Sequence, residues 1–309
     1  MKQYANLHNH TTHSDGVYTP SEIVRVAKEE GYGAIAVTDH DVASAFLEVH
    51  RACQDSGMEC LFGAEFSTSS VMGEAFHIVG LQFNADEPKM KEYLRRLSYN
   101  ETHQTQVLFE RGIQEGLIAG ITWEEVIEFN KGITWLCNEH VFRAMKAKGL
   151  KKDIDYQDFF FCVYGDRRGE VPQVYPFLSP KELIDLIHKA GGIAIFAHPG
   201  ASFSRLKELI DLGIDGLEVW YNDKNNDIEL KRSQLQAALD YGLFVSGGSD
   251  HSGLCGGQYE RYENPETSNH YAQPCSLGTT EFFFKELQSK KLSNERREYI
   301  LQLLKREDI

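Results

Sequence analysis

Two stretches of the chain repeat one pattern of apolar and polar positions. Residues 19–40, TPSEIVRVAKEEGYGAIAVTDH, and residues 179–199, SPKELIDLIHKAGGIAIFAHP, each begin with Ser or Thr, followed by Pro and then by Glu two positions later. This order is a capping box with Pro at the first helical position, and it predicts the start of a helix. Each stretch then passes through Gly into a short apolar run, which predicts a strand. The two predicted strands end in Asp-His and in His-Pro.

The same order of helix, turn and strand continues in the second half of the chain. Residues 204–221 and 230–251 each show a helical pattern, a Gly-containing turn and an apolar strand. Residues 59–68 and 74–83 have the pattern of two adjacent strands. Repetition of such units is typical of an α/β fold built on a parallel sheet or barrel. We therefore expect an α/β barrel.

Residues 98–165 differ in character, because their apolar positions follow helical spacing and indicate no strand. We expect this segment to be a helical insertion, a substrate lobe, between two parts of one barrel. The first part comprises residues 1–97, and the second comprises residues 166–309 with closing helices in 281–309.

Composition limits the classes of protein to consider. The 309 residues are 41% hydrophobic and 25% charged, which is ordinary for a soluble globular protein, and the formal charge is −14. An acidic chain disfavours binding to long duplex DNA, although a basic run, RAMKAKGLKK, lies at residues 143–152. Because no run of 18 apolar residues, signal-like N-terminus or CxxC pair occurs, we expect a cytoplasmic protein with reduced thiols and no membrane partner.

Histidines and carboxylates recur where the predicted strands end. The stretch NLHNHTTHSDG contains His8 and His10, two positions apart, so that on a strand both side chains point to one side. In β/α barrels the active site lies at the carboxyl ends of the strands, and imidazoles are common ligands of divalent metals. Alone, this pair is equally typical of a polar loop. A metal site is predicted because eight groups follow one pattern: His8, His10, Asp15, His40, Glu65, His77, His198 and Asp250.

The order of these motifs resembles that of the polymerase and histidinol phosphatase (PHP) family of metal-dependent phosphoesterases. The resemblance rests on HxHTxxSDG at residues 8–16, TDH at 38–40, Glu65, FHIVG at 76–80, AHPG at 197–200 and GSD at 248–250. Two further segments, NEHVFRAMKAKG and VYGDRRGEVPQVYP, resemble a subgroup related to 3′,5′-nucleotide bisphosphate phosphatases and to 5′ to 3′ exoribonucleases that act on short RNA. The similarity extends over nearly the whole chain.

The resemblance implies a distorted (β/α)7 TIM-like barrel that carries two to three divalent metals, Mn, Zn or Fe. The implied ligands are His8, His10, Glu65 and Asp250 for the first metal, Glu65, His77 and His198 for the second, and Asp15 and His40 for the third. Such metals hold phosphoryl oxygens and supply a bridging hydroxide near neutral pH, so the implied reaction is hydrolysis of a phosphomonoester. We expect the substrate to be a nucleotide of the 3′,5′-bisphosphate type, another phosphorylated small molecule or a short RNA end.

One motif departs from the family pattern. The family has Asp-x-His, whereas this chain reads GGSDHSG, which places His251 directly after Asp250. On an extended segment a shift of one residue reverses the direction of a side chain, but the neighbouring glycines relax that constraint. We expect His251 to act as a metal ligand, a substrate contact or a general acid. Asp15, Glu65 and His251 are the expected catalytic residues.

Four basic side chains are candidates for binding the rest of the substrate. His140 and Arg143 lie three positions apart on a predicted helix and so share one face, and Arg can bind phosphate with two hydrogen bonds. We expect them to hold a second phosphate or the nucleoside, and the alternative is an exposed helix face. Arg167 and Arg168, in GDRRGEV, are further candidates of this kind.

Two other classes of function fit part of the pattern. Amidohydrolases, which hydrolyse C–N bonds, also begin with HxH on their first strand, and a catalytically inactive metal-binding module would account for the displaced His251. The SDG, TDH and AHPG motifs and the bridging position implied for Glu65 favour phosphoester chemistry.

Overall fold

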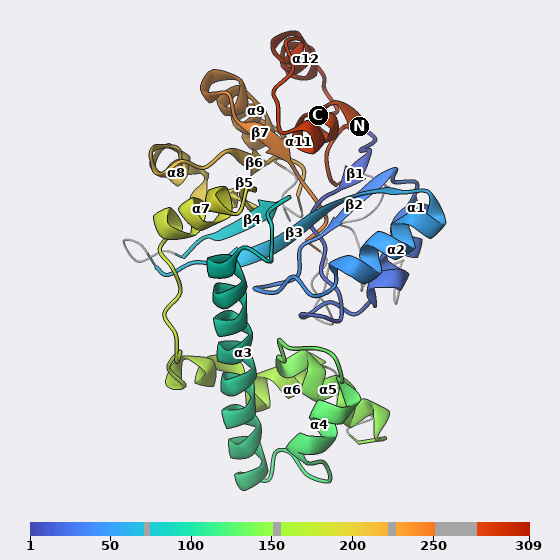
Figure 1. Cartoon of the computed structure of the whole chain (residues 1–309), viewed down its shortest axis with the longest axis vertical. Coiled ribbons are helices and arrows are strands. Elements are labelled where there is room, and N and C mark those ends of the chain that lie inside the picture. The colour runs from blue at the N-terminus through green and yellow to red at the C-terminus, as the bar shows by residue number, and fades with distance from the viewer. Residues whose placement is uncertain (71–74, 151–155, 222–226, 251–276) are drawn as a thin grey trace.

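The computed structural model describes residues 1–70, 75–150, 156–221, 227–250 and 277–309. Its centre is a curled sheet of seven strands, arranged in space in the order of the chain (Figure 1). The strands are β1 (Ala5–Asn6), β2 (Ala34–Val37), β3 (Glu59–Ser67), β4 (His77–Leu81), β5 (Ile193–Phe196), β6 (Gly216–Glu218) and β7 (Phe244–Ser246). The α/β class predicted from the sequence is confirmed.

Strand β4 runs against the direction of the other strands. β1, β2 and β3 pair in parallel, β4 is antiparallel to both β3 and β5, and β5, β6 and β7 again pair in parallel. Because β4 is reversed, its first residue, His77, pairs with Ser67 at the end of β3. The backbone oxygen of His77 also accepts a hydrogen bond of 3.2 Å from Ala197 N, just after β5. His77 therefore lies at the edge where the parallel strands end.

The curl of the sheet brings its first and last strands together. Leu7 N donates a hydrogen bond to Gly247 O at 3.0 Å, and Asp250 N donates one to His8 O at 2.9 Å. A Cβ at Gly248 would lie 2.2 Å from His8 N, so the close approach of these two segments requires glycine. The side chains that follow β1 and β7 consequently meet in one region.

Helices surround the sheet (Figure 1). Among the described residues, they are α1 (Pro20–Glu30), α2 (Phe46–Ser56), α7 (Pro180–Lys189), α8 (Leu206–Leu212), α9 (Ile228–Tyr241), α11 (Glu281–Ser289) and α12 (Arg296–Leu303), with the short 3-10 helix η2 (Gly200–Arg205). A second 3-10 helix, η1 (Gly165–Glu170), packs against α3 and α6 instead. Both predicted capping boxes are present, since Thr19 caps α1 with Glu22 and Ser179 caps α7 with Glu182. Within the described ranges, no helix is both long and apolar enough to cross a bilayer.

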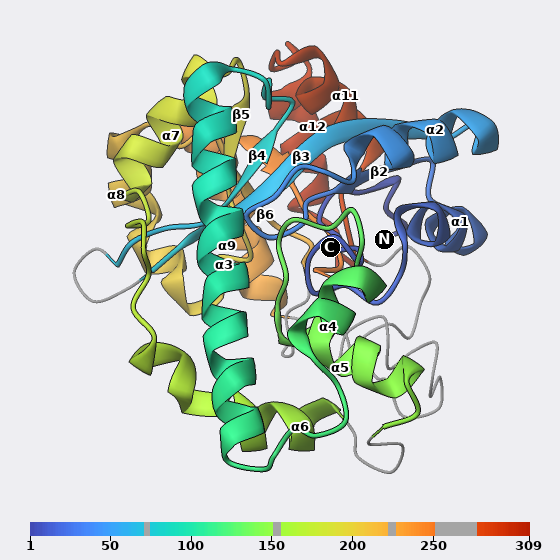
Figure 2. The same cartoon turned by 60° about the horizontal axis from the view of Figure 1, so that its bottom comes forward.

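A helical lobe projects from the sheet (Figures 1 and 2). It contains most of α3 (Pro88–Gln114) together with α4 (Trp123–Phe129), α5 (Asn138–Ala147) and α6 (Tyr156–Val163). The lobe has its own buried core, which includes Leu108 and Phe142, whereas Met90 and Leu97 at the start of α3 belong to the core beside the sheet. The boundary predicted at residue 98 falls inside α3, because this helix continues unbroken from the sheet into the lobe.

Candidate metal centre

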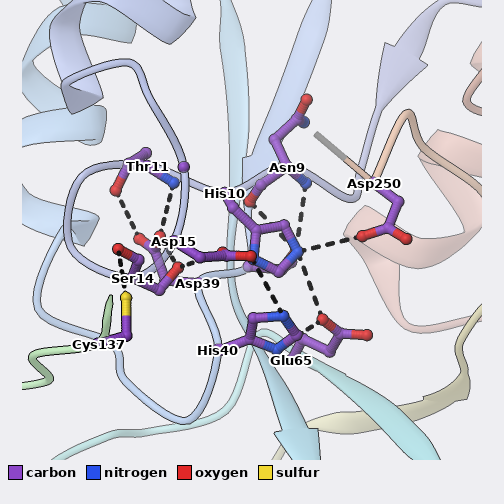
Figure 3. Close-up of polar contacts among 12 residues, drawn as sticks. Asn9, His10, Thr11, Ser14, Asp15, Asp39, His40, Glu65, Cys137 and Asp250 are labelled. Carbon is purple, nitrogen blue, oxygen red and sulfur yellow. Dashed lines mark hydrogen bonds and ion pairs between the residues drawn. The ribbon is translucent and has the colours of Figure 1, made fainter. Parts of the chain in front are cut away.

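Polar side chains converge where the parallel strands end, and Figure 3 shows several of them. They come from six strands and one loop: His8 and His10 after β1, Asp15 in the following loop, His40 after β2, Glu65 within β3, His77 at the start of β4, His198 after β5 and Asp250 after β7. The eight groups selected from the sequence are thus brought into one cluster.

Glu65 lies at the centre of this cluster and is fully buried. Its two carboxylate oxygens lie 2.9–3.3 Å from ring nitrogens of five histidines: His8, His10, His40, His77 and His198. Asp250 Oδ1 is 3.6 Å from His8 Nε2 and 3.4 Å from His10 Nε2. One carboxylate therefore faces several converging imidazoles, with a second carboxylate beside them.

The donor atoms of the cluster fit divalent metals. His8 Nε2, His10 Nε2 and Glu65 Oε2 are buried and make no hydrogen bond. Unsatisfied buried polar atoms are rare and unfavourable, and a cation coordinated by all three would satisfy them. Among the described residues, three groups offer ligand atoms that all lie within 4.8 Å of one another: His8, His10, Glu65 and Asp250; His10, Asp15 and His40; His40, Glu65 and His77.

The first of these groups coincides with the first predicted ligand set. The second predicted set was Glu65, His77 and His198, whereas the structure groups Glu65 and His77 with His40. His198 stays close, with Nε2 2.9 Å from Glu65 Oε1 and 3.4 Å from His77 Nδ1. His10 joins Asp15 and His40, the third predicted set. His251 lies outside the described residues, so its position relative to this set is not described.

The charges in the cluster compensate one another. Burial raises the pKa of the Glu65 carboxyl, but His77, His8 and His40 outweigh burial and hold that pKa well below its ordinary value. Burial lowers the pKa of His198, whereas its contact with Glu65 raises it to about 9 overall. The carboxylates therefore favour the protonated form of His198 and raise the pKa of His8, His10 and His40. Since ligating imidazoles must be neutral, binding of a divalent metal here would release protons.

Glu218, which the sequence analysis did not select, orients two of the histidines. Its Oε1 lies 2.9 Å from His8 Nδ1, and its Oε2 accepts a 2.6 Å hydrogen bond from His198 N. Glu218 is fully buried at the last position of β6. A carboxylate on one ring nitrogen fixes the tautomer of a histidine and leaves the other nitrogen for a metal. The sequence feature that could have identified Glu218 is its position as a carboxylate at the end of an apolar strand, in GLEVWY.

Asp39 holds the loop that carries Asp15. Its carboxylate accepts hydrogen bonds from Thr11 N at 2.6 Å, Thr11 Oγ1 at 2.8 Å and Ser14 Oγ at 2.7 Å (Figure 3). Asp15 Oδ1 then lies 3.1 Å from His10 Nδ1. The TDH motif predicted a role for its histidine only, because its aspartate acts through neighbouring residues.

Two residues of the cluster have an unfavourable backbone conformation. The φ angle is 28° at His198 and 48° at Asp250. Positive φ is uncommon for residues other than glycine, and residues held in such conformations concentrate at functional sites. The hydrogen bonds of their backbone N–H groups to Glu218 and His8 hold both residues in place.

His140 contacts the backbone of the Asp15 loop. Its ring is fully buried, with Nε2 3.0 Å from Thr12 O, and Cys137 N donates a hydrogen bond to Nδ1 at 3.0 Å. Burial and the positive charge of Arg143 together lower the pKa of His140 to about 3. The ring is therefore neutral at pH 7, with Nδ1 accepting and Nε2–H donating.

Arg143 reaches the same loop one turn further along α5. Its Nη1 donates to Gly16 O at 2.6 Å and its Nη2 donates to Ser14 O at 3.4 Å. His140 and Arg143 share one helix face, as predicted, but this face meets the loop of the metal centre. Their observed contacts are with this loop, and the substrate-binding role expected for them stays a prediction.

The two consecutive arginines of η1 point in different directions. Arg167 Nη1 pairs with Glu115 Oε2 on the surface of the lobe. Arg168 Nη2 donates to both carboxylate oxygens of Glu101, at 2.6 and 2.7 Å, and its Nε donates to Gln104 Oε1 at 3.2 Å. Burial raises the pKa of the Glu101 carboxyl, while Arg168 opposes that rise.

A cavity of about 580 Å³ opens between the metal centre and the helical lobe. Its wall includes cluster residues on one side and residues of the lobe on the other, among them Asp15, His40, His77, Glu101, Trp135 and Arg168. Trp135 stacks on His40, with ring centroids 6.1 Å apart and an interplanar angle of 25°. The volume is typical of a site for a small ligand.

Comparison with known proteins gives the family. Residues 6–190 match the PHP domain. The chain is 31% identical over 261 residues to the 5′-3′ exoribonuclease Rnm of Salmonella typhimurium, covering 81% of this chain and 85% of that protein. It is 27% identical over 259 residues to the 3′,5′-nucleoside bisphosphate phosphatase of Chromobacterium violaceum, covering 79% and 86%.

A solved structure from Bifidobacterium adolescentis, described as that of a metal-dependent phosphoesterase, has the same fold. Its TM-score is 0.72 at 24% identity, covering 94% of this chain and 98% of that one. Together with the cluster, the PHP domain match and the named relatives define a metal-dependent hydrolase of phosphate esters. The chain belongs to the PHP domain family. The sequence prediction of a metal-dependent phosphoesterase is thereby confirmed, and the assignment of each ligand stays a prediction.

Proposed function

We propose that this protein hydrolyses a phosphomonoester on a nucleotide of the 3′,5′-bisphosphate type or at the end of a short RNA. The observation that carries the proposal is the opening of the histidine cluster into a cavity of about 580 Å³ with Arg168 in its wall. A phosphate at the cluster and a second phosphate near Arg168 would place both negative groups beside positive charge. The names of the relatives, an exoribonuclease and a nucleoside bisphosphate phosphatase, support this substrate class.

The proposed architecture follows the family. We propose that the curled sheet is a distorted (β/α)7 barrel, formed by residues 1–97 and 166–309, and that residues 98–165 form its insertion domain. The proposed metal ligands are the eight clustered residues, with Glu65 shared between sites: His8, His10, Asp15, His40, Glu65, His77, His198 and Asp250. His251 is proposed as a further ligand, a substrate contact or the general acid.

When bound, two to three metals of the Mn, Zn or Fe type supply a hydroxide nucleophile near neutral pH and neutralise charge on the phosphoryl group. Glu65 and the imidazoles around it would hold those metals where the cluster opens into the cavity. Asp15, whose side chain is 19% exposed in the cavity wall, lies within reach of the substrate. Glu101 holds the Arg168 guanidinium in position to attract a second phosphate.

The proposed function is tested with three substrates in protein loaded with Mn²⁺: adenosine 3′,5′-bisphosphate, a 5′-phosphorylated short RNA and an aryl phosphate. Metals are counted per chain in the same sample. We expect turnover of the bisphosphate or the RNA at a kcat/KM well above that of the aryl phosphate. Turnover of the aryl phosphate alone would contradict the substrate class, and turnover of cyclic amides without any phosphate ester would contradict phosphoester chemistry.

The role of Arg168 is tested against its neighbour. Arg168→Gln should raise KM for the bisphosphate by about 10-fold or more, because a hydrogen bond to a charged group is worth about 1.5–3 kcal/mol. The aryl phosphate, which has no second phosphate, should be affected little. Arg167→Gln is the matched control, since Arg167 pairs with Glu115 on the lobe surface. Equal effects of Arg168→Gln on both substrates would exclude the proposed contact.

A further inference from the structure

Asp41 lies in the cavity wall directly after His40. It belongs to none of the three ligand groups found among the described residues, and it is only 5% exposed. Its backbone N donates a hydrogen bond of 2.8 Å to Glu65 O, and its φ angle is 54°. This left-handed conformation is uncommon for residues other than glycine, and residues held in it concentrate at functional sites. The chain thus holds a buried carboxylate in a fixed position beside the metal centre.

The two carboxylate oxygens of Asp41 have different surroundings. Oδ1 accepts a hydrogen bond of 2.9 Å from Ser67 N, and Ser67 pairs with His77 across strands β3 and β4. Among the described residues, Oδ2 has no hydrogen-bond partner, and it is not one of the unpartnered atoms that the protein encloses completely. Because Asp41 lines the cavity, Oδ2 is the oxygen that is open to it.

Holding the backbone of Ser67 does not explain a carboxylate at position 41. One acceptor oxygen is enough for that hydrogen bond, and an asparagine would supply it. A buried carboxylate is unfavourable unless charges or hydrogen bonds compensate it, and in the described part of the chain Asp41 makes no ion pair. Oδ2 is therefore available to a hydrogen-bond donor that enters the cavity.

The position of Asp41 determines which part of a substrate it meets. Asp41 follows His40 in the chain and is joined through Ser67 to the strand position paired with His77, so it lies beside two imidazoles of the cluster. A carboxylate repels a phosphate but accepts a hydrogen bond from a hydroxyl. In a nucleoside 3′,5′-bisphosphate, only the phosphate on O3′ has a hydroxyl, the 2′-hydroxyl, on the neighbouring carbon. An acceptor beside the cluster therefore favours the 3′-phosphate at the cluster and the 5′-phosphate toward Arg168.

We propose that Asp41 selects ribonucleotides by accepting a hydrogen bond from the 2′-hydroxyl, with the 3′-phosphate at the histidine cluster. This inference rests on the proposed function and adds its sugar specificity. An aspartate or glutamate also binds the ribose 2′-hydroxyl in dinucleotide-binding folds. A 2′-deoxyribose brings no donor to Oδ2, so the carboxylate loses water without gaining a partner. For a hydrogen bond to a charged group, the resulting preference for ribose is about 10- to 150-fold.

The first test compares adenosine 3′,5′-bisphosphate with its 2′-deoxy analogue in protein loaded with Mn²⁺. We expect kcat/KM to be higher for the ribose substrate by the factor given above, with adenosine 5′-monophosphate and phosphate as the products. Equal kcat/KM for the two sugars, or release of the 3′-monophosphate, would overturn the role of Asp41 and leave the proposed phosphatase activity standing. Turnover of neither bisphosphate nor short RNA would overturn both.

Two substitutions test Asp41 itself. Asp41→Asn keeps an acceptor for Ser67 N and tolerates the left-handed backbone but removes the charge, whereas Asp41→Gly removes the side chain at a φ angle that suits glycine. The ratio of kcat/KM between the two sugars should fall by about 5-fold or more in Asp41→Asn and the preference should disappear in Asp41→Gly. Asp211→Asn, at an exposed carboxylate paired with Lys207, is the matched control. A ratio that stays unchanged in both Asp41 variants would overturn the proposal.

Binding of the product separates sugar recognition from catalysis. Calorimetry compares adenosine 5′-monophosphate with its 2′-deoxy analogue in the unmodified Mn²⁺-loaded protein and in both Asp41 variants, with metals counted per chain. We expect tighter binding of the ribose form by the unmodified protein, loss of that difference in Asp41→Gly, and the same number of metals in all three proteins. Loss of a metal from Asp41→Asn would identify Asp41 as a ligand instead. Equal binding of the two nucleotides by the unmodified protein would also overturn the proposal.

Discussion

Arg143→Ala tests whether the helical lobe holds the metal centre in shape. The Arg143 guanidinium donates to Gly16 O at 2.6 Å and to Ser14 O at 3.4 Å, on both sides of Asp15. A hydrogen bond that involves a charged group contributes about 1.5–3 kcal/mol, and the bond to Gly16 is the one with good geometry. This hydrogen bond should stabilise the loop chiefly in the metal-bound protein, where Asp15 must keep one position. Its loss should then lower the affinity for the metal at Asp15 by about 10- to 150-fold.

The assay is a titration of metal-free protein with Mn²⁺, followed by calorimetry and by metal counting at several free concentrations. We expect the weakest metal site of Arg143→Ala to weaken while the site formed with Glu65 and Asp250 keeps its affinity. Lys146→Ala, an exposed cation on the same helix, is the matched control. Unchanged affinities at every site, in a variant whose melting temperature confirms folding, would refute the loop-anchor interpretation.

Three further predictions follow from the site. Glu218→Gln should reduce metal affinity by about 10- to 100-fold, because the Glu218 carboxylate orients His8. Glu208→Gln, a substitution on the surface, is the control. Equal metal affinities of the two variants would contradict the role of Glu218. Because the pKa of His140 is about 3 in the folded protein and ordinary, about 6.5, in the unfolded chain, the unfolded chain takes up the proton first as the pH falls. The free energy of unfolding should therefore decrease between about pH 6.5 and 3 by up to about 1.4 kcal/mol per unit, and urea titrations should show a shallower pH dependence for His140→Gln. Removal of metal by a chelator should lower the melting temperature. Mn²⁺ at about 100 times its dissociation constant should restore about 2.7 kcal/mol of the free energy of unfolding, measured by thermal unfolding with and without metal. Equal melting temperatures would argue against metal binding at the buried donor atoms.

The parts of the fold and site that were predictable are those fixed by local sequence or by the topology of parallel strands. Thr19 and Ser179 begin helices because a capping box is a local interaction. His40 and His198 both reach Glu65 because they follow strands of the same direction, and the carboxyl ends of such strands share an edge.

Other features depend on contacts that a linear pattern does not encode. Helical spacing placed His140 and Arg143 on one face but did not indicate that this face meets the Asp15 loop. Glu218 was missed because it acts on the far nitrogen of a histidine.

Helix α3 fixes the orientation of the helical lobe relative to the sheet. Met90 and Leu97 are buried beside the sheet, Glu101 lines the cavity, and Leu108 is buried in the lobe, all on one unbroken helix. One residue inserted between Leu97 and Leu108 would turn everything beyond it by about 100° and shift it by about 1.5 Å, since a helix has about 3.6 residues per turn. Insertions in the connections between the lobe helices would leave this angle unchanged. The length of the connection between α3 and α4 can therefore vary without changing this angle, whereas α3 can change only by steps that restore its rotation.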